Sequence, residues 1–207
     1  MVKFIYFDVG GVVILDFSKT NKWHDFSKEI GIPEDKEKEF LNFWDYKEPM
    51  INVGLDADLL IPEIEEKFQI KVPKNYSLLY DGFISRFEIN KSLLPVIHEL
   101  KKLYKIGLLT NQYPRMFEIL KRTKLLPKIS WDVIIDSSIE KIKKPNPKIY
   151  KLAEKLSKVK GDEIFFIDNQ EENLESAKKF NWLTFLYDPA NPNKSSKALL
   201  QNFKKII

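Results

Sequence analysis

The chain has 207 residues, of which 43% are hydrophobic and 31% charged, a composition typical of a globular protein and unlike that of a disordered one. The net charge of +4 is mild and mixed in sign, so it does not indicate nucleic-acid binding, although it would favour a small anionic substrate near a lysine-lined cleft. The absence of cysteine excludes disulfide bonds and a cysteine nucleophile, and it fits a reducing, cytoplasmic environment.

The first apolar run of the chain, Phe4–Leu15, lies near the N-terminus, where a signal peptide would lie, but it lacks the features of one. Asp8 interrupts the run, and no small-residue cleavage site follows it. No stretch reaches the roughly 18 uninterrupted apolar residues that a membrane span requires. We therefore expect neither a signal peptide nor a membrane-spanning segment.

Five short apolar runs, each bounded by polar or turn residues, predict buried β-strands. Segments with helical spacing separate the last four runs, and a further helix is expected before the second. The alternation of strand and helix predicts an α/β fold with a Rossmann-like parallel sheet, right-handed crossovers and helices on both faces. The predicted strands are Lys3–Phe7, Lys105–Thr110, Trp131–Asp136, Ile164–Asp168 and Thr184–Tyr187, and the helices are Lys91–Tyr104, Tyr113–Arg122, Pro147–Leu156 and Glu171–Phe180.

Residues 18–87 break this alternation because their spacing is helical throughout. They predict an all-helical domain inserted into a core made of residues 1–17 and 88–207, with hinges near Asp16–Phe17 and Glu88–Lys91. Prolines and a glycine should end its helices. The predicted helices are Ser18–Ile30, Glu34–Tyr46, Ala57–Phe68 and Tyr76–Phe87, and the punctuating residues are Pro33, Pro49, Gly54 and Pro73.

Polar residues follow the predicted strands at the point where each one ends. In an open parallel sheet ligands bind beyond the carboxyl ends of the strands, so these residues should meet at one rim. Lys144 lies on the loop after the third strand. The residues at the strand ends are Asp8, Thr110, Asn111, Ser137, Ser138, Asp168 and Asn169.

Asp8 is the candidate nucleophile of that rim. It stands at the tip of the first strand, and Gly10 and Gly11 would let the backbone turn sharply and approach a ligand closely. A carboxylate in this position can attack in line and form a covalent intermediate. An aspartate that only caps a turn would explain the same position.

The other rim residues each have a chemical and a structural interpretation. Thr110 and the amides near Asn111 can hold oxygens of a transferred group, but either residue can instead cap a helix. Lys144 can neutralise an anion, but it can also belong to a solvent-facing basic loop. Asp168 and Asn169 offer oxygens that suit Mg²⁺, although Asn169 can also cap the following helix.

Together these four motifs resemble, in order and spacing, those of the haloacid dehalogenase superfamily. The helical insertion resembles the cap that the family places between its first two motifs. The opening Asp-Val-Gly-Gly-Val (8–12) and the turn around Gly54 within Ile51–Leu59 are similar to the branch of glucose-1-phosphate phosphatases and of the N-terminal phosphatase of epoxide hydrolases.

The resemblance implies a hydrolase, most simply a phosphatase of small phosphorylated metabolites that works through an aspartyl-phosphate on Asp8. The implied catalytic residues are Asp8, Thr110, Asn111 and Lys144. The implied substrate-binding residues are Gly10, Gly11 and, in the cap, Lys47. The implied cofactor is Mg²⁺, held at Asp8, Gly10, Asp168 and Asn169.

Two departures from the family pattern qualify this expectation. Gly10 stands where phosphatases of the family carry a second aspartate as general acid and base. Asn169 stands where they carry an acidic metal ligand, so we expect Mg²⁺ to bind weakly. Two alternatives stay open: a catalytically impaired or non-enzymatic protein, and a metal-independent 2-haloacid dehalogenase, for which composition offers Trp23, Trp44 and Arg86 as halide-binding candidates.

Overall fold

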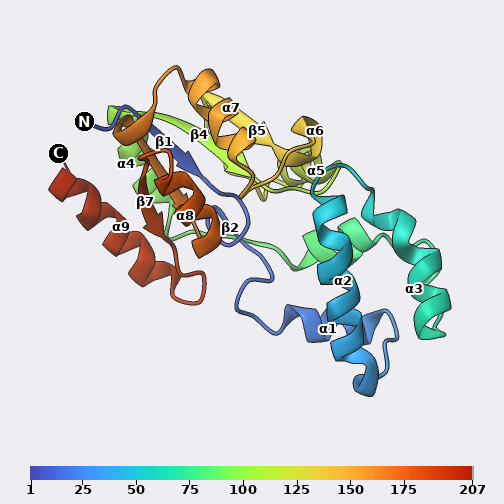
Figure 1. Ribbon diagram of the computed structural model, residues 1–207. Coiled ribbons are helices and arrows are strands. Elements are labelled where there is room, and N and C mark those ends of the chain that lie inside the picture. Colours follow the sequence, from blue (N-terminus) through green and yellow to red (C-terminus); the bar gives the residue numbers. More distant parts are fainter. Residues whose placement is uncertain (207) are drawn as a thin grey trace.

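The computed structural model describes residues 1–206 and contains a five-stranded parallel sheet with helices on both faces (Figure 1). The strand order is β5-β4-β1-β6-β7. All five predicted strands are present, and the predicted fold class is confirmed. The strands are β1 (Phe4–Phe7), β4 (Lys105–Thr110), β5 (Val133–Asp136), β6 (Ile164–Asp168) and β7 (Leu183–Leu186).

The central strand β1 is buried on both faces and divides the core of the sheet in two. Phe4 and Tyr6 point to one face, where they pack with residues of α7 (Pro147–Ser157) and α8 (Glu171–Lys178). Ile5 and Phe7 point to the other face, which α4 (Leu94–Leu103), α5 (Met116–Arg122) and α9 (Pro192–Ile206) cover. Alternate residues of a strand face opposite ways, so one short run of four apolar residues anchors both layers.

Helix α9 and the short helix α6 (Ser137–Glu140) are not predicted from the sequence. Helix α9 packs on α4, and its Leu199 and Phe203 are buried in the core. Helix α6 begins directly after β5, where the Asp136 carboxylate accepts a hydrogen bond from the N–H of Ser138 (2.8 Å). Within the described residues we find no helix whose length and apolar character would let it span a bilayer.

The segment predicted to be helical extends from one end of the sheet (Figure 1). Its α-helices are α1 (Lys22–Glu29), α2 (Glu37–Ile51) and α3 (Ile61–Phe68). One part of the prediction is wrong. Pro49 does not end a helix but lies inside α2, at the cost of the hydrogen bond to the carbonyl of Asp45, an exposed residue that water can reach. The last predicted stretch, Tyr76–Phe87, is helical, but as a π-helical turn (Leu78–Phe83) followed by a 3₁₀ turn (Ile84–Arg86).

Short 3₁₀ turns complete the chain at Glu34–Lys36, Ala57–Leu60 and Gly161–Glu163. Two further strands, which are not predicted from the sequence, lie next to the first predicted hinge and within the second. Strand β2 (Ile14–Leu15) pairs antiparallel with β3 (Glu88–Ile89), so the chain enters and leaves the helical segment at adjacent points. Each strand has two residues, too few to produce a recognisable alternation.

Candidate active site

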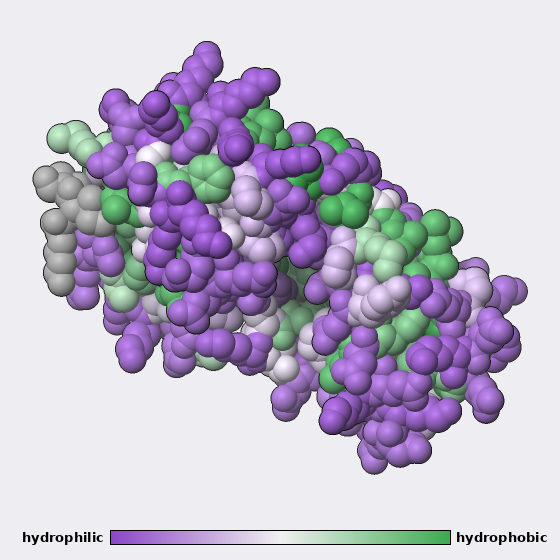
Figure 2. Space-filling view, viewed as in Figure 1, coloured by the Kyte–Doolittle hydropathy of each residue, from purple (hydrophilic) through white to green (hydrophobic). Residues whose placement is uncertain are grey.

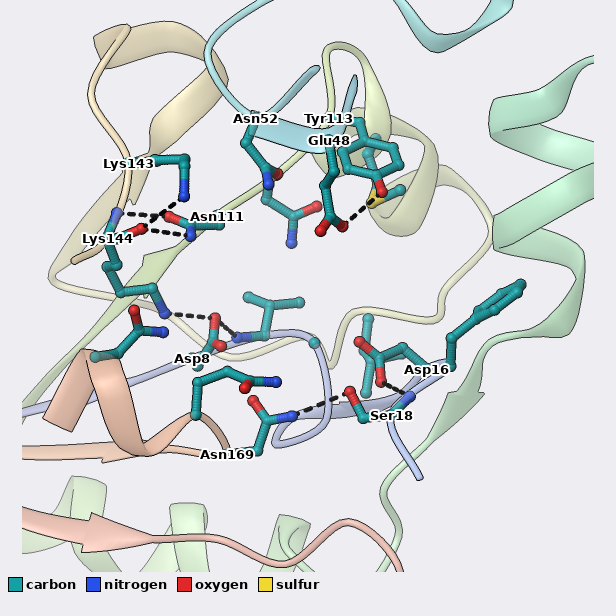
Figure 3. A pocket seen from close by; sticks show the side chains of 18 of the residues that line it. Asp8, Asp16, Ser18, Glu48, Asn52, Asn111, Tyr113, Lys143, Lys144 and Asn169 are labelled. Atoms are coloured by element: carbon teal, nitrogen blue, oxygen red, sulfur yellow. Dashed lines mark hydrogen bonds and ion pairs between the residues drawn. The ribbon is translucent and has the colours of Figure 1, made fainter. Parts of the chain in front are cut away.

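A cavity of about 360 Å³ lies between the carboxyl end of the sheet and the helical segment. Figure 2 shows it as a hollow between the two parts of the molecule, and Figure 3 shows the residues around it. The rim residues Asp8, Asn111, Lys144 and Asn169 line it, as the convergence of strand ends predicts. Among its other lining residues are Asp16, Phe17, Ser18, Trp23, Glu48, Asn52, Phe83, Phe87, Tyr113 and Lys143.

Lys144 forms the centre of the polar network at the floor of this cavity. Its Nζ lies 3.0 Å from Oδ1 of Asp8 and 2.6 Å from Oδ2 of Asp168, and its side chain is fully buried. Asn173 also donates to Oδ2 of Asp168 (3.0 Å), while the N–H of Gln170 donates to Oδ1 (2.8 Å). Lys144 is therefore not a residue of a solvent-facing loop, and Asp168 already accepts hydrogen bonds from three protein donors.

Burial sets the charge state of this network. It raises the pKa of Asp8 to about 7, with Lys144 opposing and the charge of Asp168 adding to the increase. Burial disfavours the charged form of Lys144 as well, but the two carboxylates outweigh that effect and raise its pKa. Lys144 thus stays protonated at neutral pH and is the main group that favours the ionised form of Asp8.

Asn111 fixes the loop that carries Lys144. Its Oδ1 accepts a hydrogen bond from the backbone N–H of Lys144 (2.8 Å), and its Nδ2 donates to the carbonyl oxygen of the same residue (3.0 Å). Thr110 is fully buried beneath the cavity, where its hydroxyl accepts from Nε2 of Gln112 (3.2 Å) and helps lower the pKa of Asp8. Asn111 thus holds the backbone of Lys144, and Thr110 contacts Asp8 from beneath the cavity.

The loop after Asp8 has no room for a side chain at position 11. Gly11 has φ +71°, and a β-carbon there would lie 2.3 Å from Nδ2 of Asn169. The close approach lets Nδ2 of Asn169 donate to the hydroxyl of Ser18 (3.0 Å), and the amide oxygen of Asn169 then faces Asp8 (Figure 3).

Few oxygens are left for a metal ion. Within residues 1–206 no three acidic or histidine side chains form a cation-binding group. Because Asp168 is held by Lys144, Asn173 and Gln170, the side-chain oxygens that face the cavity from the expected metal-binding residues are those of Asp8 and Asn169. One carboxylate and one amide oxygen are compatible with Mg²⁺ but supply little charge for holding it.

The helical segment adds a second wall to the cavity. Glu48 of α2 points into it and accepts a hydrogen bond from the hydroxyl of Tyr113 (2.8 Å), which in turn accepts one from Nε1 of Trp44 (3.1 Å) (Figure 3). Burial raises the pKa of Glu48, while the bond from Tyr113 opposes the increase. The carbonyl of Asn52 accepts from the hydroxyl of Ser137 (2.6 Å), which joins α2 to the core.

Three candidate residues of the helical segment lie outside the cavity lining. Lys47 points away and pairs with Glu63 of α3 (2.7 Å). Arg86 is bound to Glu29 and to the carbonyls of Asp81 and Gly82. Trp44 is completely buried among aromatic rings, whereas Trp23 does reach the cavity.

Sequence reasoning missed Asp16, Glu48, Asn52, Ser18 and Lys143. Glu48 and Asn52 follow Trp44 at intervals of four residues, so a helix continued through Pro49 would have placed all three on one face. Asp16 follows β2 directly, and burial raises its pKa while the N–H of Ser18 opposes the increase. In the sequence, the feature that could have pointed to Asp16 is its position as an aspartate at the predicted hinge.

A model of the haloacid dehalogenase-like hydrolases matches residues 2–181 of the chain. Among solved structures, the chain is similar to a predicted HAD-like family hydrolase from Porphyromonas gingivalis, with 24% identity, coverage of 97% of this chain and 98% of that one, and a TM-score of 0.74.

Two further structures have lower identity. A HAD family enzyme from Bacteroides thetaiotaomicron, solved as an aspartate-to-alanine mutant with magnesium and inorganic phosphate, is 20% identical over 90% of this chain and 94% of that one, with a TM-score of 0.70. The L-2-haloacid dehalogenase from Xanthobacter autotrophicus is 17% identical over 90% of this chain and 78% of that one, with a TM-score of 0.63. At these identities the likeness shows a shared fold.

Proposed function

The chain belongs to the haloacid dehalogenase-like hydrolase family, and we propose that it is a phosphatase of small phosphorylated metabolites that forms an aspartyl-phosphate on Asp8. The observation that carries the proposal is the buried triad in which Lys144 bridges Asp8 and Asp168. Lys144 opposes the protonation of the buried Asp8 carboxylate at the floor of the cavity and places a cation beside the position of an incoming anion. Lys143 lines the same cavity and adds a second cation.

In the proposed first step, an oxygen of Asp8 attacks the phosphorus of a monoester while the bond to the leaving oxygen breaks. Lys144 balances charge on the phosphoryl oxygens, and Asn111 holds its loop in place. Water then attacks the phosphorus, the bond to Asp8 breaks, and inorganic phosphate leaves. When bound, Mg²⁺ would add positive charge beside the transferred group, and Asp8 and Asn169 are the residues that would hold it, weakly.

We also propose that residues 18–87 act as a cap that selects the substrate. The segment contributes Trp23, Glu48 and Phe83 to the cavity, opposite the triad. An aromatic wall with one carboxylate and one amide suits a small organic group that carries hydroxyls better than a bare anion. We expect a cap-deleted core, if it folds, to hydrolyse small esters with little selectivity.

Gly10 and Asn169 favour the dehalogenase as the second candidate, because that chemistry needs neither the second acid nor a metal. Against it, Arg86 is bound within the helical segment, and no arginine lines the cavity among the described residues. The third possibility is a protein without catalytic activity. It follows from Gly10 and Asn169 as well, because both positions lack the acids that family phosphatases carry there.

One pair of assays separates the candidates. A panel of phosphate monoesters with Mg²⁺ should release phosphate, and acid-quenched protein should carry a phosphoryl group on the peptide that contains Asp8. Short 2-halo acids with a chelator should release no halide. Halide release by the unmodified protein would overturn the phosphatase, and inactivity in both assays would favour the non-enzymatic alternative.

A further inference from the structure

The space beside Gly10 is filled by a carboxylate from another part of the chain. A β-carbon on Gly10 would lie 2.5 Å from Oδ2 of Asp16. Standard bond lengths place the carboxylate oxygens of an aspartate about 2.4 Å from its own β-carbon. Oδ2 of Asp16 therefore lies at the distance from position 10 where an aspartate at that position would hold its own oxygens.

The backbone at Gly10 does not itself demand glycine. Its φ lies outside the left-handed region, unlike that of Gly11, and the close contacts that a β-carbon would meet there are atoms of the Asp16 side chain. The obstacle to a side chain at position 10 is thus Asp16.

Local structure holds Asp16 in this place. The loop after Asp8 forms a bridge between Gly10 and Ile14, which brings the turn and the strand that leads to Asp16 together. Beyond that strand, Oδ1 of Asp16 accepts a hydrogen bond from the N–H of Ser18 (2.8 Å), while Oδ2 is the atom next to Gly10. Figure 3 shows Asp16 and Asp8 on the same side of the cavity, across from Glu48.

We infer that Asp16 is the general acid and base of this site and replaces, from a different position in the chain, the second aspartate missing at Gly10. The inference rests on the proposed phosphatase function. As an oxygen of Asp8 attacks phosphorus and the bond to the leaving oxygen breaks, the Asp16 carboxyl donates its proton to that oxygen. Its carboxylate then takes a proton from the water that attacks phosphorus, the bond to Asp8 breaks, and both residues return to their starting states.

The leaving group gives the sharpest test, because a proton donor matters for a poor leaving group and little for a good one. The value of kcat/KM reports the step in which the ester bond breaks, so it should be measured for glycerol 2-phosphate and for p-nitrophenyl phosphate. Asp16→Asn, which keeps the shape of the side chain, should lower the first value by about 10²–10³-fold and the second by less than about tenfold.

Two single variants serve as controls. Asp25→Asn makes the same chemical change on an exposed residue of α1 and should change neither value. Glu48→Gln removes the carboxylate on the opposite wall and should affect both substrates without the selective loss. Circular dichroism and melting temperature would verify the fold of each variant.

A double variant tests the replacement directly. Gly10→Asp combined with Asp16→Ser returns the acid to position 10 and removes the obstacle. Its kcat/KM for glycerol 2-phosphate should therefore be at least about tenfold higher than that of Asp16→Ser alone. Equal losses for both substrates in Asp16→Asn, or a selective loss in Glu48→Gln, would overturn the inference while leaving the phosphatase intact. If the unmodified protein hydrolyses neither ester, the proposed function fails and the inference fails with it.

Discussion

The two walls of the cavity are built in different ways. On the core side, Asp8, Lys144 and Asp168 form a buried network in which one lysine bridges two carboxylates, and one backbone donor and one amide donor also bind Asp168. On the side of the helical segment, aromatic rings predominate, and Glu48 and Asn52 are the main polar groups. A change on the core side leaves a buried charge without its partner, whereas a change on the other side mostly alters the shape and polarity of the cavity.

The two walls suit different tasks. In the core wall, Asp8, Lys144 and Asp168 affect one another's charge state, and such a coupled network suits a chemical step that stays the same from substrate to substrate. The helical wall packs through rings such as Phe17, Trp23, Phe26 and Phe83, whose centres lie 4.9–6.3 Å apart. A single polar residue of the helical wall can therefore be replaced without leaving a buried charge of the core wall unpaired. Variants on the two walls should therefore fail in different ways.

The largest effect should come from Asp8→Asn. The amide cannot act as the nucleophile, so turnover of phosphate esters should fall by about 10⁴-fold or more, while the similar shape and the bond from the N–H of Val9 preserve the loop. Stopped assays with several esters and a melting curve would measure both properties. Turnover close to that of the unmodified protein would show that Asp8 is not the nucleophile.

Lys144→Met should damage both chemistry and stability. It leaves Asp8 and Asp168 facing each other in a buried place without a cation, so we expect a loss of about 3–5 kcal/mol in the free energy of unfolding. The pKa of Asp8 should rise further, and kcat should fall by about 10²-fold or more at neutral pH. Urea unfolding and a pH–rate profile would measure these changes.

Lys143→Met is the matched control for stability. Lys143 is half-buried, and within the described part of the chain its Nζ donates to the carbonyl oxygen of Lys144 alone (3.3 Å). The free energy of unfolding should change by less than about 1 kcal/mol. Similar losses in the two variants would mean that the bridge between the carboxylates does not stabilise the core wall.

The core wall was predictable from the sequence for a topological reason. Parallel strands deliver their carboxyl ends to one edge, so locating five apolar runs was enough to bring Asp8, Asn111 and Asp168 together. The helical wall was not predictable in the same way, because Pro49 was expected to end the helix before Glu48 and Asn52. On the core side, Asp16 was not predictable either, since its position depends on the pairing of β2 with β3, and those strands are too short to show a pattern.

Asn169→Asp should have a smaller effect, and in the favourable direction. It adds a negative charge next to Asp8 at the place where the family carries an acidic metal ligand, so Mg²⁺ should bind about tenfold more tightly and phosphate release at low Mg²⁺ should increase. Calorimetry with Mg²⁺ would measure the binding. The exchange also removes the donor to the hydroxyl of Ser18, so Ser18→Ala serves as the control for that loss. Unchanged Mg²⁺ affinity would place the metal, if one is used, away from position 169.

The smallest effects should separate two neighbours on α2. Successive residues of a helix point about 100° apart, and here Glu48 faces the cavity while Lys47 pairs with Glu63. Glu48→Gln should raise KM for the preferred substrate by about tenfold or less, with a smaller change in kcat, because it removes a contact to the substrate and not to the reacting atoms.

Lys47→Met should leave KM and kcat within about twofold, and it should cost less than about 1 kcal/mol of stability, since a partly exposed ion pair contributes little. The sequence predicts the opposite, with Lys47 as the substrate contact, because a cation suits an anionic ester. In the structure the lysines that line the cavity are Lys143 and Lys144, which reach it from the core. If Lys47→Met raised KM more than Glu48→Gln did, the substrate would have to approach along the α2–α3 surface, and the helical wall would select it by charge and not by shape.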